Sequence, residues 1–196
     1  MAFRAASWCG AWAVVLVLSM HSITTQSAAG HIEHRVLATL RTSTMENELN
    51  DAAAAGFRFQ AVMGGETAFG GKEVVVVMAR TVDGPRYAYR LLATARTSTM
   101  QQELSEAAAA GYEYRGQTVF KTALGGDEVV VILERDEAAG TPAFEYRLFA
   151  TTRTSTLQKE LADAGMAGFE VVGLTVSRTA VGGKELVAIA RRRKTP

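Results

Sequence analysis

The chain contains three copies of one unit. Segments Arg35–Arg80, Arg90–Arg135 and Arg147–Arg192 align without a gap, at offsets of 55 and 57 residues. The connecting segments Thr81–Ala88 and Asp136–Glu145 absorb the difference, and each holds a proline and a glycine, as linkers commonly do. Because all insertions fall between copies, the unit is predicted to be a compact structural module. We divide the chain into repeat 1 (30–84), repeat 2 (85–140) and repeat 3 (141–196).

The hydrophobic pattern changes three times within a unit. In the second copy, YRLLATA is a short apolar run that predicts a strand. Met100, Leu104 and Ala107 then recur at helical spacing in an alanine-rich stretch, and Gly111 stands where a left-handed helix cap favours glycine. YEYRGQTVF and EVVVILER predict two further strands, with a Gly-Gly turn between them. The unit is therefore predicted to be β-α-β-β.

The order of strands follows from connection rules. A right-handed crossover makes the first two strands parallel, and a hairpin makes the third antiparallel to the second. An antiparallel sheet then needs the third strand in the centre, in the order 1-3-2. The third segments (EVVVVMA, EVVVILE and ELVAIAR) are the most continuously apolar, as a central strand under a helix should be.

The units are too small to be stable alone. A unit of about 46 residues buries little core and leaves two open sheet edges. We therefore expect an α+β protein in which three antiparallel sheets form one compact body with pseudo-threefold symmetry, as a continuous sheet or closed ring with helices on the outer face. The alternative is three loosely linked domains, which the short linkers and small units argue against.

The three tandem copies resemble a known family, the small bacterial domains catalogued as domain of unknown function 4177, and the third copy matches best. The matching positions follow the family's aromatic-Glu-Tyr strand and its glycine-aromatic-Glu turn: Phe144, Glu145, Tyr146, Arg147, Leu161, Gly165, Gly168, Phe169, Glu170, Val171 and Val172. The first two copies have Ala54 and Ala109 at the position of Gly165, and the family's usual Trp is replaced by Phe57, Tyr112 and Phe169. The resemblance implies the fold and carries no activity.

The first 29 residues differ from the rest. Arg4, the apolar run Trp8–Leu18 and a small-residue segment ending in QSAA predict a signal peptide, and residues 1–29 are assigned to it. The alternative is an N-terminal anchor that stays attached, although the apolar run is short for a membrane span. Cleavage after Ala29 or Ala28 would remove the single cysteine, Cys9. We expect a periplasmic or secreted protein with no transmembrane segment after signal removal.

The tetrapeptide RTST begins each predicted helix. Ser43, Ser98 and Ser155 precede Glu46, Gln101 and Gln158 by three residues, the spacing of a capping box. An arginine beside hydroxyls and free N–H groups can also hold an anion such as phosphate or carboxylate. The candidate anion-binding residues are Arg41, Ser43, Thr44, Arg96, Ser98, Thr99, Arg153, Ser155 and Thr156.

Ion pairing is the alternative role for the three RTST arginines. The available partners are the repeated helix glutamates Glu48, Glu103 and Glu160 and the hairpin glutamates Glu73, Glu128 and Glu185. Exposed arginines in a concavity would favour anion binding, and arginines buried against glutamates would favour a structural role.

Two further features at the chain ends carry hypotheses. If cleavage follows Ala28, His31 is the third residue and can help chelate Cu(II) or Ni(II). If cleavage follows Ala29, this chelate cannot form and His31 and His34 remain a weak pair; the alternative to either is a frayed tail. The basic segment Arg191–Lys194 can contact an anionic membrane surface or acidic partner, or be a solvated strand end. No metal site or cofactor is predicted beyond the weak His31 candidate.

The composition favours no catalytic class. Removal of Arg4 would leave 20 of the 21 basic residues against 20 acidic ones, so no nucleic-acid partner is expected. The mature chain would have no cysteine and two histidines near one end, too few for histidine-based catalysis. We therefore predict a non-enzymatic structural or protein-interaction protein, alternatively a small-anion or small-molecule binder, that is a monomer or small homo-oligomer.

Overall fold

The structure is a computed structural model that describes residues 32–66, 72–80, 86–94, 96–121, 127–139, 144–178 and 183–194. Unit 1 consists of β1 (Glu33–Thr39), α1 (Thr42–Ala54), β2 (Arg58–Glu66) and β3 (Lys72–Arg80). Unit 2 consists of β4 (Tyr87–Thr94), α2 (Thr97–Ala109), β5 (Glu113–Lys121) and β6 (Asp127–Asp136). Unit 3 consists of β7 (Phe144–Thr151), α3 (Thr154–Met166), β8 (Glu170–Arg178) and β9 (Lys184–Arg193). The predicted signal peptide, His31 and the Gly-Gly turn segments 67–71, 122–126 and 179–182 lie outside the described residues.

The predicted sheet topology is confirmed in every unit. The sheets have the orders β1-β3-β2, β4-β6-β5 and β7-β9-β8, with antiparallel pairing throughout. The last strand of each unit is the central one, and it is the most continuously apolar of the three. The protein is α+β with an internal threefold repeat.

Each helix ends at the predicted glycine. Gly56, Gly111 and Gly168 have φ values of 85°, 82° and 80°, a conformation that favours glycine because a Cβ would be strained there. The aromatic residue that follows each glycine lies between two arginines. Phe57, for example, has the Arg35 and Arg80 guanidinium carbons 4.2 and 4.9 Å from its ring centre, and the Arg80 guanidinium donates to the Ala55 carbonyl at the helix end.

The same pair of arginines occurs in the other units. Arg90 and Arg135 flank Tyr112, and Arg147 and Arg192 flank Phe169. Arg135 and Arg192 also donate to the carbonyls that end α2 and α3. The arginines at the two ends of each aligned repeat therefore fix the last turn of its helix to its sheet.

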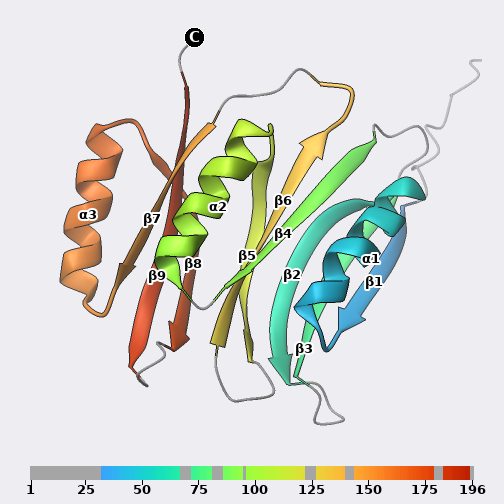
Figure 1. The fold of residues 1–196 in the computed structure, drawn as a ribbon, viewed down its shortest axis with the longest axis horizontal. Helices are drawn as coiled ribbons and strands as arrows, with labels where there is room; N and C mark the ends of the chain where they lie inside the picture. Colours follow the sequence, from blue (N-terminus) through green and yellow to red (C-terminus); the bar gives the residue numbers. More distant parts are fainter. Residues whose placement is uncertain are drawn as a thin grey trace, which may run out of the picture.

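The units are arranged in a row. Units 1 and 3 lie at opposite ends of the long axis, and β4 and β7 lie between successive helices on the side where the helices gather (Figure 1). The expectation of a continuous sheet or closed ring is therefore wrong: the strands form three separate sheets, and α3 packs mainly on its own unit. The units associate through sheet faces and helices, so within the described ranges the two ends of the row have no neighbouring unit.

Successive units share their cores. Met45, Leu49 and Ala52 of α1 pack in one cluster with Val130 and Ile132 of the next unit. A second cluster likewise joins α2 to Val187 and Ile189 of unit 3, and includes the predicted helix-face residues Met100, Leu104 and Ala107. The cluster under α3 has only three buried members, Ala164, Phe169 and Ala190. Each helix is thus covered by the unit that follows it, except the last.

Candidate functional site

The helix starts differ from the predicted capping boxes. The N-cap residues are Arg41, Arg96 and Arg153, and none of them makes a side-chain cap hydrogen bond. Ser43 is already the second residue of α1, so its hydroxyl cannot cap the helix. Thr44 instead donates its hydroxyl to the Arg41 carbonyl at 3.0 Å. The capping-box prediction is therefore wrong.

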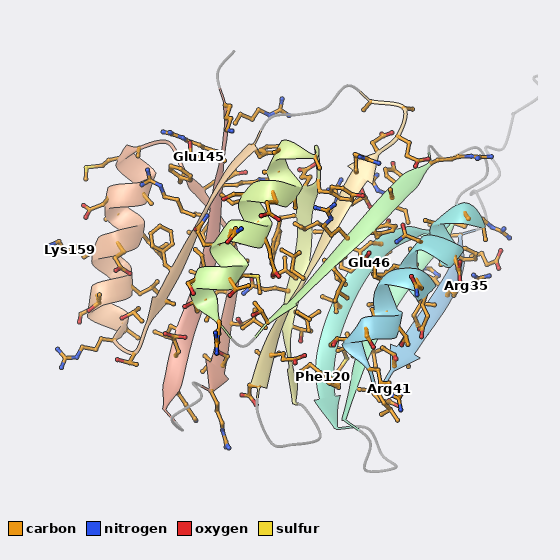
Figure 2. All side chains as sticks on the ribbon, in the orientation of Figure 1. Arg35, Arg41, Glu46, Phe120, Glu145 and Lys159 are labelled. Atoms are coloured by element: carbon orange, nitrogen blue, oxygen red, sulfur yellow. The ribbon has the colours of Figure 1, made fainter. Side chains whose placement is uncertain are left out.

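The glutamate and glutamine of the expected boxes contact the next unit instead. A Glu46 carboxylate oxygen accepts the Leu91 N–H of β4 at 2.8 Å. Gln101 accepts the Leu148 N–H of β7 at 2.8 Å and donates to the Tyr146 carbonyl at 3.1 Å. These side chains therefore occupy the outer edge of the following unit's first strand, where backbone groups would otherwise be open. The labelled Glu46 lies between α1 and β4 (Figure 2).

The structure leaves all nine candidate anion-binding residues exposed. Arg41, Arg96 and Arg153 head three separate helices, and no ion pair among the described residues involves them. The proposed pairing with the repeated glutamates is thus not observed. Figure 2 shows Arg41 at the start of α1.

The concave surface beside the first helix start is acidic. A cavity of about 410 Å³ lies between α1, β4 and α2, and its lining includes Ser43, Glu46 and Glu103. Burial, with a smaller effect of the Glu106 charge, raises the pKa of Glu103. Two carboxyl groups and no arginine line this cavity, so its electrostatics do not suit an anion.

A buried carboxylate holds the junction between units 1 and 2. Glu134 of β6 is 2% exposed. It accepts hydrogen bonds from Arg58 of unit 1 at 2.9 Å, from the Arg115 Nε at 2.9 Å and from the Tyr89 hydroxyl at 2.7 Å. The Tyr89 hydroxyl in turn accepts the Phe59 N–H at 2.8 Å. A bulge in β2 after Phe59 directs that N–H away from the sheet ladder.

The pKa shifts at this junction keep its hydrogen-bond donors protonated. Burial raises the pKa of Tyr89, and the Glu134 charge raises it further, so the hydroxyl stays protonated and donates to the carboxylate. Burial alone would lower the pKa of Arg58, but the hydrogen bond and charge of Glu134 raise it overall. Glu134 therefore has charged and neutral donors that remain protonated at neutral pH.

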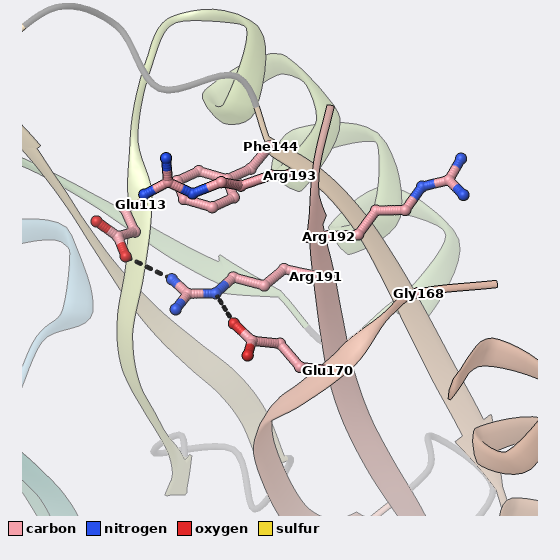
Figure 3. Close-up of a pocket in the computed structure, with 7 residues that line it drawn as sticks. All are labelled: Glu113, Phe144, Gly168, Glu170, Arg191, Arg192 and Arg193. Atoms are coloured by element: carbon pink, nitrogen blue, oxygen red, sulfur yellow. Dashed lines mark hydrogen bonds and ion pairs between the residues drawn. The ribbon is translucent and has the colours of Figure 1, made fainter. Parts of the chain in front are cut away.

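The junction between units 2 and 3 has the opposite charge order. Glu113 occupies the position of Arg58, and Arg191 occupies the position of Glu134. Arg191 bonds Glu113 at 2.5 Å and Glu170 at 2.8 Å in a pocket of about 290 Å³ (Figure 3). Burial would lower the pKa of Arg191, but these carboxylates raise it. The reversed charges disfavour a junction between unit 1 and unit 3, because Arg58 would then meet Arg191.

The basic C-terminal segment is partly used within the fold. Arg191 pairs with two glutamates, and Arg192 bonds Glu145 at 2.7 Å. The Arg193 guanidinium lies 5.7 Å from the Phe144 ring centre. Three of the four basic residues therefore have intramolecular contacts, and the description of this segment as a merely solvated end is wrong.

The exposed apolar side chains lie at the two ends of the row. In unit 1 they are Ile32, Val36, Leu40 and Met63, and in unit 3 they are Met166, Val171, Leu174 and Val176. None of the large exposed apolar residues in the described part of the chain belongs to unit 2. Soluble proteins seldom expose apolar residues in groups, and such groups commonly mark interaction sites.

Sequence reasoning overlooked the residues that join the units. Glu134 interrupts an apolar strand at a position where unit 1 has Ala79 and unit 3 has Arg191, and this difference between copies is visible in the aligned repeats. The roles of Glu46 and Gln101 had no comparable signal, since their spacing equally fits a local cap.

Neither a metal centre nor a membrane-spanning helix is found in the described ranges. No group of three or more His, Cys, Asp or Glu residues there is placed to hold a metal ion. No helix there combines the length and apolar character needed to cross a membrane.

No protein-family model, curated protein or solved structure matches this chain. The resemblance to domain of unknown function 4177 therefore stays a prediction.

Proposed function

We propose that this chain is an exported, non-enzymatic repeat protein that acts by binding another protein chain through the ends of its row of units. The observation that carries the proposal is the restriction of large exposed apolar side chains to units 1 and 3. Unit 2 has the same fold, and the positions equivalent to Val36, Met63, Val171, Leu174 and Val176 are buried or half-buried there. The exposed groups therefore match surfaces that form interfaces elsewhere in the same molecule.

The charged groups of the described residues support a structural rather than a catalytic role. Glu134, the most deeply buried acid, has three side-chain donors and is held rigidly between units. Arg191, Arg192 and their glutamates likewise pair with one another. A catalytic acid or base would need an open side facing a substrate, whereas these groups direct their polar atoms at each other.

Export is proposed from the N-terminal pattern of charge, apolar run and small residues. The test is the intact mass of the protein recovered from the exported fraction. We expect a chain that begins at Gly30, or at Ala29 if cleavage occurs one residue earlier. A full-length chain retained in membranes would contradict export and indicate an anchor.

Site-specific photo-cross-linking tests the binding proposal. A photoreactive amino acid is placed at Val176, on the exposed end face of unit 3, in the exported chain. We expect a discrete heavier product, whose components are identified by peptide mass spectrometry. The matched control carries the same group at Ala109, an exposed position of the central helix α2. A folded protein that gives no product from Val176, or equal products from both positions, would contradict the proposal.

Anion binding at the helix starts is the second candidate. The exposure of Arg41, Arg96 and Arg153 favours it, whereas the acidic cavity beside α1 argues against it. Titration with inorganic phosphate distinguishes the two functions. Three equivalent sites that disappear in the Arg41→Ala, Arg96→Ala, Arg153→Ala triple variant would establish anion binding; we expect no saturable binding.

A further inference from the structure

The two internal junctions use the same three contacts. First, a helix side chain binds the outer edge of the next unit's first strand, as Glu46 does at Leu91 and Gln101 at Leu148. Second, the N–H beside the strand bulge donates to the next unit's tyrosine: Phe59 to Tyr89 at 2.8 Å, and Tyr114 to Tyr146 at 2.7 Å.

Close approach between second strands is the third shared contact. A Cβ at Gly116 would lie 3.0 Å from atoms of Phe59 and Val62 in the preceding unit. A Cβ at Gly173 would lie 2.3 Å from the Tyr114 hydroxyl oxygen and 2.1 Å from the Gln117 side-chain oxygen. We call the side of a unit that presents Phe59 or Tyr114 its forward face, and the side that presents Gly116 or Gly173 its backward face.

Unit 3 presents a forward face with no following unit. Gln158 stands in α3 where Glu46 and Gln101 stand in α1 and α2, and it is exposed. Val171 stands in place of Phe59 and Tyr114, at the same bulge in β8. Val171, Leu174 and Val176 are 51%, 59% and 52% exposed, and α3 buries only Leu157 and Ala164, whereas α2 buries four residues.

Unit 1 presents a backward face with no preceding unit. The outer edge of β1 is unpaired within the described ranges, and Val36 stands there in place of Leu91 and Leu148. His34 replaces Tyr89 and Tyr146, and its ring has a nitrogen that can accept a hydrogen bond when neutral. Val36 is 62% exposed and Met63 61% exposed.

The side-chain sizes on these two faces are complementary. Unit 1 has Ala61 where the other units have glycine, which adds a methyl group at the point of closest approach. Unit 3 has Val171 where the other units have a ring, which removes bulk at the same point. A contact between the two faces therefore places the smaller Val171 side chain, in place of a ring, beside the Ala61 methyl.

The charges on these faces also permit contact. Glu170 occupies the position of Arg58 and Glu113, and it is already paired with Arg191 of its own unit. On the backward face of unit 1, the position equivalent to Glu134 and Arg191 is Ala79, which carries no charge. No like charges meet, and no buried charge is left without a partner.

We propose that the forward face of unit 3 binds the backward face of unit 1 in a second copy of this chain, continuing the internal junction head to tail. This inference rests on the proposed function and specifies its partner. Gln158 then binds the edge of β1 at Val36, and the Val171 N–H donates to His34. Such an interface joins two different surfaces, so it adds copies in a series until the series closes on itself.

Mixing of two one-sided variants tests the proposal. Leu174→Glu blocks the forward face and Met63→Glu blocks the backward face. Both replace side chains that are already solvent-exposed, and thermal unfolding monitored by circular dichroism verifies that each variant folds. The matched control is Ala109→Glu on the solvent face of α2. Oligomer size is measured by sedimentation velocity over a concentration series of the purified exported protein.

We expect wild type and Ala109→Glu to form dimers and longer species. Each one-sided variant alone should be monomeric, with a dissociation constant raised about tenfold or more. Their mixture should form dimers and nothing longer, because one intact forward face and one intact backward face remain. A mixture that stays monomeric while wild type dimerises would indicate a symmetric dimer and overturn the proposal.

Wild type that is monomeric at every concentration also overturns the proposal. The Val176 cross-link then separates this failure from that of the proposed function. A product that contains a different protein supports the binding function with another partner. The absence of any product contradicts both the binding function and self-association.

Discussion

Unit 2 and unit 3 have the same strands, helix and topology, but very different surroundings. In unit 2, the six residues Val129–Glu134 of the central strand are all buried, and α2 is covered by β7. In unit 3, no strand of a following unit packs on α3 within the described part of the chain, and the core cluster under this helix has three buried members. The comparison shows that much of the burial in a unit comes from its neighbours, and nearest-neighbour models of repeat proteins then predict that much of its stability does too.

Substitution of equivalent leucines in α2 and α3 gives the largest expected difference in the free energy of unfolding. Leu104 of α2 is 0% exposed, and Leu161 stands at the same position of α3 but is only partly buried. Leu104→Ala should lower the free energy of unfolding by about 2–5 kcal/mol because it opens a cavity in a shared core. Leu161→Ala should cost clearly less, since its surroundings are already open. Urea unfolding of both variants measures the difference; equal losses would refute the comparison.

Substitution of the central charged residue of each junction gives the next largest expected loss in the free energy of unfolding. Glu134→Ala should lower the free energy of unfolding by about 1–3 kcal/mol, because it leaves Arg58 and the buried Tyr89 hydroxyl without their acceptor. Arg191→Ala changes the same position of unit 3, where the arginine side chain is 21% exposed and the Glu170 side chain 65% exposed. Water can hydrate the groups left there, so the loss should be smaller. Chemical denaturation tests this, and a larger loss for Arg191→Ala would contradict it.

The strand-binding glutamines provide a sharper test. Gln101→Ala removes two hydrogen bonds to β7 and should cost about 1 kcal/mol. Gln158→Ala changes the equivalent residue of α3, which makes no such contact with any residue that the structure describes. The variant should leave the unfolding of dilute protein unchanged. The same variant should weaken self-association in sedimentation experiments. A loss of dilute-state stability in Gln158→Ala would show that α3 already has a partner.

Replacement of Glu103 gives the smallest expected change in stability, and the size of that change depends on pH. Burial raises the pKa of this carboxyl in the folded state, so the folded chain binds more protons than the unfolded chain. Its favourable contribution is therefore fully present below the unfolded-state pKa of about 4.3 and is lost as pH rises through the folded-state pKa. Glu103→Gln should raise the urea midpoint at pH 7 and not near pH 3.5, measured against Glu137→Gln as an exposed control. A benefit that grows at low pH would contradict this sign.

The sequence predicted the architecture of a unit but not the way units join. The gap-free repeats and their changing periodicity were sufficient for the β-α-β-β order, the central third strand and the glycines at 56, 111 and 168. These features depend on local patterns and on connection rules that act within a unit. The row of units depends on face-to-face packing, which the alignment of repeats does not encode.

Glu46 illustrates why the site was harder to predict than the fold. Its distance of three residues from Ser43 fits a helix cap, but the Leu91 N–H, which is far away in the sequence, lies within reach and donates to the Glu46 carboxylate. Local spacing cannot reveal such a partner. The role of Glu134 was easier to predict from the sequence, because a single acid in an apolar strand must have donors nearby if it is buried.

The sharing of cores between successive units also sets an order in time. A chain grows from its N-terminus, so α1 and its sheet are complete before Val130 and Ile132 have been synthesised. The apolar face of unit 1 stays uncovered until most of unit 2 exists, and that of unit 2 until Val187 and Ile189 are added. The native structure is therefore reached only when nearly the whole chain is present.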